Sequence, residues 1–226
     1  MRDTGSFLAA LQLADSALPM GRFVHSYGLE AWVSADERIA AELVELIETA
    51  LLEAIGPLDG AAVAHAHRAV SLDDLIQLDR LLTAHKLTPS ARIASCSCGR
   101  QLARLAPRLI TDTLVDEFCT RVRSEMSDGN LAIVEGVVGR GLGLSAEETV
   151  LIELRGVAVA FLSAAIRLGR FSPLHAQVAL RRLGPVIAQA AEEALALPRD
   201  RLRSTGPELE IYALSHRRAD ARLFTT

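Results

Sequence analysis

The chain has 226 residues, enough for one large domain with a continuous core, and half of them are hydrophobic while only 4% are aromatic. Such a core must be built from Ala, Leu, Val and Ile, and abundant Ala and Leu favour helices over strands. The net charge of −4 argues against general binding to nucleic acid and against attachment to an anionic membrane.

Helical periodicity is nearly continuous, and no strand-like alternation is sustained. We therefore expect an all-α, single-domain bundle of about ten helices. In chain order, helices are expected over about 6–14, from near 26, over 34–55, 71–86, from 88, from 111 or 112 to near 127, and over 130–140, 145–168, 172–197 and 208–219. The domain is expected to span 1–226, with flexible segments at 1–5 and about 199–226.

Several of these helices have recognisable starts. A Ser or Thr followed three residues later by an acid, or followed directly by Pro, is typical of a helix N-terminus. The pattern occurs at Ser34 with Glu37, Ser71 with Asp74, Thr88-Pro89, Ser145 with Glu148 and Ser172-Pro173. Gly56-Pro57 is predicted to stop the helix that begins near Ser34.

Cysteine usage and hydropathy favour a soluble, cytoplasmic protein. The three cysteines, Cys96, Cys98 and Cys119, do not form the even set of a disulfide framework, and no secretory leader opens the sequence. The most apolar run, Gly156 to Ile166, is too short to span a bilayer. Helices after residue 130 are apolar on most of their circumference, which is typical of a bundle centre or an oligomer interface.

The spacing of the candidate metal-binding, thiol and phosphate-binding motifs does not match that of known sites of these kinds. His65 and His67 lie about 200° apart on a helix and cannot grip one ion, and Cys96 with Cys98 is not a C-x-x-C motif. The glycines of "GRGLGLSAEE" (139–148) follow a helix and precede no lysine, so they are interpreted as a helix C-cap and linker. No H-E-x-x-H, E-x-x-H or G-x-S-x-G occurs. We expect no catalytic, cofactor or metal site.

The stretch "PMGRFVHSYGLEAW" (19–32) differs from the Ala- and Leu-rich remainder. Pro19 fixes φ, Gly21 permits a left-handed turn, and Phe23 and Tyr27 share a face if they are helical. From these residues alone, the stretch is interpreted as a bend between helices whose aromatic side chains are buried.

This stretch also carries a family resemblance. "LQLADSALPMGRFVHSYGLE" resembles the N-terminal signature of the urease accessory protein UreF family, with Pro19, Gly21, Phe23, Ser26, Gly28, Leu29 and Glu30 in register. The similarity continues in order at "GRQLARL" (99–105), "AIVEGVVGRGLGLS" (132–145), "AAIRLGRFSPLHAQ" (164–177) and "ALSHRRADARLF" (213–224). Typical members differ at Asn130, where they carry His, at Ile93, where they carry an acid, and at Arg217-Arg218, where the usual R-H-E-T-Q run is lost.

The resemblance implies an all-helical protein that is not an enzyme and needs no cofactor. It implies a homodimer that bridges UreD (also called UreH) and the GTPase UreG, and that modulates the GTPase while nickel is delivered to apo-urease. It also implies that both ends of the chain bind partners, with His25 as part of the surface rather than a base or a metal ligand. The partner-binding positions are then Pro19, Gly21, Phe23, His25, Ser26, Tyr27, Gly28, Glu30, His216, Arg222, Leu223 and Phe224.

Two alternatives unrelated to urease remain open. A helical ligand-binding regulator needs a basic N-terminal DNA-binding unit, whereas residues 1–60 hold ten acids against three bases. A helical metal-binding protein needs His and Cys ligands brought together from distant helices, which spacing does not exclude.

Overall fold

In the computed structural model, residues 4–22, 28–30, 32, 40–206 and 211 are described, and those residues form helices and connecting turns without a strand. The predicted all-α class is therefore confirmed. The α-helices are α1 (Thr4–Leu13), α3 (Ala40–Ala50), α4 (Ala61–Arg68), α5 (Leu72–His85), α6 (Pro89–Leu105), α7 (Thr113–Arg123), α8 (Leu131–Gly141), α9 (Ala146–Arg167), α10 (Pro173–Arg182) and α11 (Gly184–Ala196). A π-helix, η2 (Leu51–Gly60), joins α3 to α4, and η3 (Ala106–Arg108) and η4 (Arg199–Arg201) are short 3-10 turns.

The helix starts predicted from capping residues are confirmed wherever the structure describes them. The side chains of Ser71, Thr88, Asp112 and Ser172 each accept a hydrogen bond from the backbone N–H three residues on. Ser145 and Glu148 form a complete capping box at the start of α9. These bonds satisfy amides that have no partner within the helix. The predicted box at Ser34 and the helix over 208–219 lie outside the described residues.

Three predicted helix boundaries are wrong. Gly56-Pro57 does not end the helix that contains α3. The backbone instead widens into the π-helix η2, and the helical path continues into α4. The i→i+5 bonding of a π-helix differs from that of an α-helix, and Pro57 lies inside this segment. The helix expected over 172–197 divides at Gly184, because Pro185 cannot continue α10. The helix after Asp112 ends at Arg123 rather than near residue 127.

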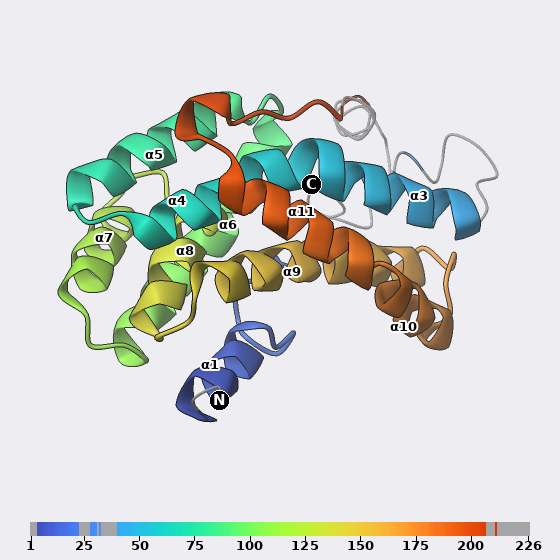
Figure 1. The fold of residues 1–226 in the computed structure, drawn as a ribbon, viewed down its shortest axis with the longest axis horizontal. Coiled ribbons are helices and arrows are strands. Elements are labelled where there is room, and N and C mark those ends of the chain that lie inside the picture. Colours follow the sequence, from blue (N-terminus) through green and yellow to red (C-terminus); the bar gives the residue numbers. More distant parts are fainter. Residues whose placement is uncertain (1–3, 23–27, 31, 33–39, 207–210, 212–226) are drawn as a thin grey trace.

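The core is centred on α9, which runs along the length of the molecule in Figure 1 with α11 beside it, α8 at one end and α10 at the other. This helix is long and apolar enough to cross a membrane by composition, but 67% of its most apolar window is buried in the fold, as in a core helix. Every residue of α8 from Leu131 to Gly139 is buried. Of the helices predicted after residue 130 to be apolar around most of their circumference, α8 and α9 are core helices, whereas α10 buries only Ala176 and Ala179.

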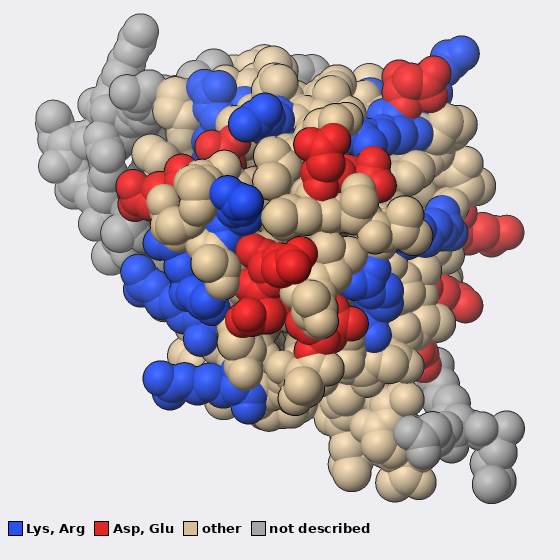
Figure 2. Space-filling view, turned by 90° about the vertical axis from the view of Figure 1, so that its left-hand side faces the viewer, with Lys and Arg blue, Asp and Glu red and all other residues tan. Residues whose placement is uncertain are grey.

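The face that carries α5 and α7 shows acidic and basic side chains interspersed (Figure 2). Neither sign of charge forms a continuous patch on the part of this face that the structure describes. Such a mixed surface is unlike the basic stripe of a nucleic-acid interface.

Candidate functional site

The segment from Pro19 to Glu30 turns at its glycines and enters the core. Gly21 and Gly28 have φ of +78° and +87°, a left-handed conformation that residues with a side chain rarely adopt. Pro19 and Gly21 are exposed, whereas Gly28, Leu29 and Glu30 are buried. The predicted left-handed turn at Gly21 is confirmed. Phe23, His25, Ser26 and Tyr27 lie outside the described residues, as do His216, Arg222, Leu223 and Phe224.

Arg22 anchors this segment inside the bundle. Arg22 is 3% exposed, and its guanidinium lies between α8 and α9, where Nη2 donates to Glu135 Oε2 at 2.8 Å and also to Glu153 Oε2. Nη1 donates to the backbone carbonyl of Glu153 at 3.3 Å. Side-chain exposure is 0% for Glu135 and 4% for Glu153. A buried arrangement of this kind specifies position, because removing one charge leaves its partners unpaired.

Gly156 provides the space that Arg22 occupies. A Cβ built on Gly156 would lie 1.6 Å from Arg22 Nη1 and 2.8 Å from Cζ, well inside van der Waals contact. This glycine lies within α9, where glycine lowers helix stability by about 1 kcal/mol relative to alanine. Its presence in the core helix therefore has a steric reason, which is the passage of a guanidinium.

The two carboxyl groups of the anchor have opposite pKa shifts. Burial raises the pKa of Glu135 well above 4.5, and this effect exceeds the attraction of Arg22. Burial also acts to raise the pKa of Glu153, but Arg22, a hydrogen bond from Glu135 and the charge of Lys86 together lower it. These opposite directions favour the protonated form of Glu135 and the ionised form of Glu153 beside Arg22, a combination that is neutral in total. A neutral cluster is far less costly to bury than an excess charge.

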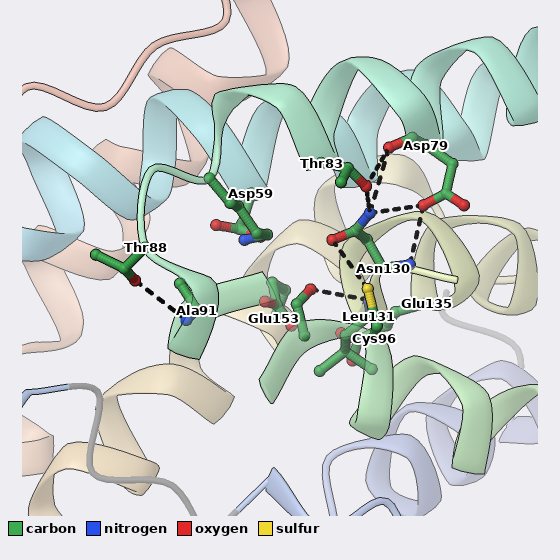
Figure 3. Close-up of polar contacts among 12 residues, drawn as sticks. Asp59, Asp79, Thr83, Thr88, Ala91, Cys96, Asn130, Leu131, Glu135 and Glu153 are labelled. Carbon is green, nitrogen blue, oxygen red and sulfur yellow. Dashed lines mark hydrogen bonds and ion pairs between the residues drawn. The ribbon is translucent and has the colours of Figure 1, made fainter. Parts of the chain in front are cut away.

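A second buried polar cluster joins α5 to the turn before α8 (Figure 3). The Asp79 carboxylate accepts hydrogen bonds from Ser127 Oγ at 2.6 Å, from the N–H groups of Gly129 and Asn130, and from Asn130 Nδ2 at 2.8 Å. Asn130 Nδ2 also donates to Thr83 Oγ1 at 2.7 Å. Asn130, one of the positions that departs from the resembled family, is therefore a structural residue here.

The two histidines of the H-A-H motif bond to different parts of the chain. His65 Nε2 bonds the carbonyl of Leu197 at 2.9 Å, and His67 Nε2 bonds that of Leu144 at 2.8 Å, so the two rings have separate partners. Burial lowers the pKa of His67. Cys98 and Cys119 are buried thiols, and burial raises their pKa values to about 11 and about 12.

The glycine stretch is likewise a helix end. Gly143 follows the end of α8 with φ of +76°, as predicted for a C-cap and linker. Within the described ranges, no three His, Cys, Asp or Glu side chains are grouped so that they could hold a metal ion.

Arg22, Glu135 and Glu153 are absent from the residues predicted from the sequence. A signal for them exists, because Glu135 and Glu153 are lone acids in the apolar runs "AIVEGVV" and "VLIELRGV". Acids are almost never fully buried unless they are paired, so such positions require a cation from elsewhere in the fold. Which cation it is depends on tertiary structure.

The fold and the anchor define an all-helical protein that holds an N-terminal segment against its core through buried ion pairs. A model of the UreF family matches residues 38–184, more than half of the chain. The chain belongs to the UreF family, a family of non-catalytic accessory proteins.

Curated relatives match over nearly the full length. The chain is 29% identical to "Urease accessory protein UreF" of Yersinia enterocolitica over 227 aligned residues, covering 99% of both chains. It is 32% identical to the protein of the same name from Photorhabdus laumondii, covering 95% of this chain and 96% of the relative. The predicted family membership is thus confirmed.

Proposed function

We propose that this protein acts as a cytoplasmic urease accessory protein, one that bridges a UreD-like protein and a UreG-like GTPase and modulates the GTPase while nickel is inserted into apo-urease. The observation that carries the proposal is the full-length similarity to proteins named for that accessory role. We also propose a homodimer, which molar mass measured by light scattering would test directly.

The anchor of Arg22 supports a partner-binding role for the segment around it. Pro19 and Gly21 are exposed beside the buried Arg22, and Leu29 and Trp32 are buried further along the chain. The core therefore holds the described backbone on both sides of residues 23–27. A surface loop positioned by a rigid scaffold is a common place for binding residues. We propose Pro19, Gly21, Phe23, His25, Ser26 and Tyr27 as one partner surface, together with Gly28 and Glu30, which are buried and would act by shaping that surface.

We propose the C-terminal residues His216, Arg222, Leu223 and Phe224 as the second partner surface. The backbone leading toward them is fixed at Thr205, whose N–H and Oγ1 both bond the carbonyl of Glu53 at 2.9 and 2.8 Å. The described backbone before residue 207 therefore lies beside η2.

Co-purification tests the proposal. The protein is co-expressed with the UreD-like and UreG-like proteins of the same host, and the complex is isolated through a tag on the GTPase. We expect a complex with the unaltered chain and with Val70→Ala, a control that truncates an 87% exposed side chain. We expect its loss with Phe23→Ala or Gly28→Arg while the helical CD signal is kept.

Failure of the unaltered chain to bind either partner would overturn the proposed function. If Phe23→Ala or Gly28→Arg unfolds the protein and causes no separate binding defect, the Pro19–Glu30 segment has only a structural role.

A further inference from the structure

A cavity of about 150 Å³ lies between η2, the start of α6 and the middle of α9. Its walls are largely apolar and include Ile55, Leu58, Val157 and Phe161. A dry apolar cavity of similar volume holds a benzene molecule in another protein. The space therefore accommodates one leucine or phenylalanine side chain. Leu87, which is 66% exposed, lies on its rim, so the described part of the mouth is apolar as well.

Two charged side chains stand beside this apolar space. Lys86 Nζ, from the turn after α5, donates to Asp59 Oδ1 of η2 at 2.6 Å, with side-chain exposures of 8% and 16%. Figure 3 shows Asp59, Thr88 and Glu153, which all line the cavity, in one region. Among the described residues, this is the one hydrogen bond that either Lys86 or Asp59 forms through its side chain. An ammonium has three donors and a carboxylate has two acceptor oxygens, so both groups retain hydrogen-bonding capacity.

The pair is complementary to a peptide group. Its total charge is zero, which disfavours a phosphate or another strongly ionic ligand, since burying an uncompensated charge is costly. One donor and one acceptor placed side by side match the C=O and N–H of a single residue in an extended backbone, which point to the same side of the chain. An apolar cavity next to them matches the side chain of that residue or of its neighbour. Anchor side chains in pockets with satisfied polar neighbours are a recurrent form of peptide recognition.

We infer that this cavity binds a leucine- or phenylalanine-sized side chain of a protein partner, whose adjacent backbone C=O and N–H bond to Lys86 and Asp59. Gly28 also lines the cavity, so the site adjoins the Pro19–Glu30 segment. The inference deepens the proposed function, because it supplies a pocket for a partner, but it does not depend on which partner binds.

Binding of capped amino acids to the full-length, 15N-labelled protein tests the inference. N-acetyl-leucinamide and N-acetyl-phenylalaninamide each carry an apolar side chain and peptide groups, N-acetyl-serinamide lacks the apolar side chain, and free leucine lacks the peptide group. We expect saturable NMR shifts of cavity residues, such as Ala94 and Val157, with the first two probes and not with the other two.

Two variants connect the shifts to the cavity. Ala94→Leu fills the space and is expected to abolish them, whereas Ala188→Leu, the same change on the exposed side of α11, leaves them intact. Lys86→Met with Asp59→Leu removes both polar groups together, and we expect affinity for the leucine probe to fall at least tenfold. The paired change avoids leaving one buried charge alone.

Three results would overturn the inference. One is an absence of shifts with the leucine and phenylalanine probes up to their solubility limits, as when the chain's own segments fill the cavity. Another is equal response to N-acetyl-serinamide or to free leucine. The third is unchanged binding by folded Ala94→Leu. Co-purification with urease partners is measured separately, so failure of the proposed function leaves these readouts intact, and the reverse also holds.

Discussion

Replacing Gly156 with alanine tests the anchor most directly. The new Cβ would lie 1.6 Å from Arg22 Nη1, so the guanidinium must move by about 2 Å to reach ordinary van der Waals distance. A shift of that size breaks the 2.8 Å hydrogen bond to Glu135 and disrupts the ion pair with Glu153. Loss of one partner from a buried ion pair costs about 3–5 kcal/mol, whereas alanine in a helix contributes about 1 kcal/mol. We therefore expect a net destabilisation of about 2–4 kcal/mol.

Urea-induced unfolding followed by circular dichroism measures this change. Gly184→Ala is the matched control, because nothing lies within 4 Å of the Cβ it adds. In an Arg22→Ala background the steric conflict is gone, so Gly156→Ala is expected to cost nothing or to stabilise slightly. The steric reasoning is refuted if Gly156→Ala alone is as stable as the unaltered protein, or if its cost is the same in both backgrounds.

Three further predictions concern buried polar groups. Because burial raises the pKa of Glu135, the unaltered protein is expected to lose stability relative to Glu135→Gln as the pH rises above 4.5 toward the folded-state pKa. The expected loss is on the order of 1 kcal/mol per pH unit, measured by urea titrations at successive pH values. A stability difference that does not change with pH would contradict this prediction. Asn130→Asp converts the donor facing Asp79 into an acid and should cost about 3 kcal/mol or more in urea unfolding at pH 7, whereas the exposed Gln101→Glu should change little; equal effects would argue against the buried cluster. Burial raises the pKa of Cys96 to about 11, so its alkylation by iodoacetamide, followed by mass spectrometry, should accelerate about tenfold per pH unit between pH 8 and 10, and a plateau above pH 9 would exclude such a thiol.

Local signals in the sequence predicted much of the fold. Capping residues act on amides three positions away, so Ser71, Thr88, Ser145 and Ser172 could be recognised without tertiary information. The helix class followed from periodicity and composition in the same way. Predictions of helix boundaries were wrong where tertiary packing determines the backbone, as at Gly56-Pro57. A Cβ built on Gly56 would lie 3.3 Å from the Cβ of Ala190 in α11. The π-helix therefore packs against a segment far along the chain.

The anchor was beyond the reach of local reasoning for a similar reason. Arg22 and Glu153 are 131 residues apart, and no spacing rule connects them. The turn at Gly21 was recognised because a φ above zero has a local cause. No local pattern marks Arg22 as a buried residue. The need for a cation was visible in the lone acids of α8 and α9, but its identity was not.

The distance along the chain between Arg22 and its partners also has a consequence for synthesis. At about 5–20 residues per second, translation takes on the order of 10 s to reach α9 after Arg22 has been made. For most of that interval neither Glu135 nor Glu153 exists to receive the guanidinium, and Glu153 is absent throughout. The N-terminal segment therefore cannot dock on the nascent bundle until more than half of the protein has been made. Arg22 can complete the core only after α8 and α9 have been synthesised, although it is among the first residues to leave the ribosome.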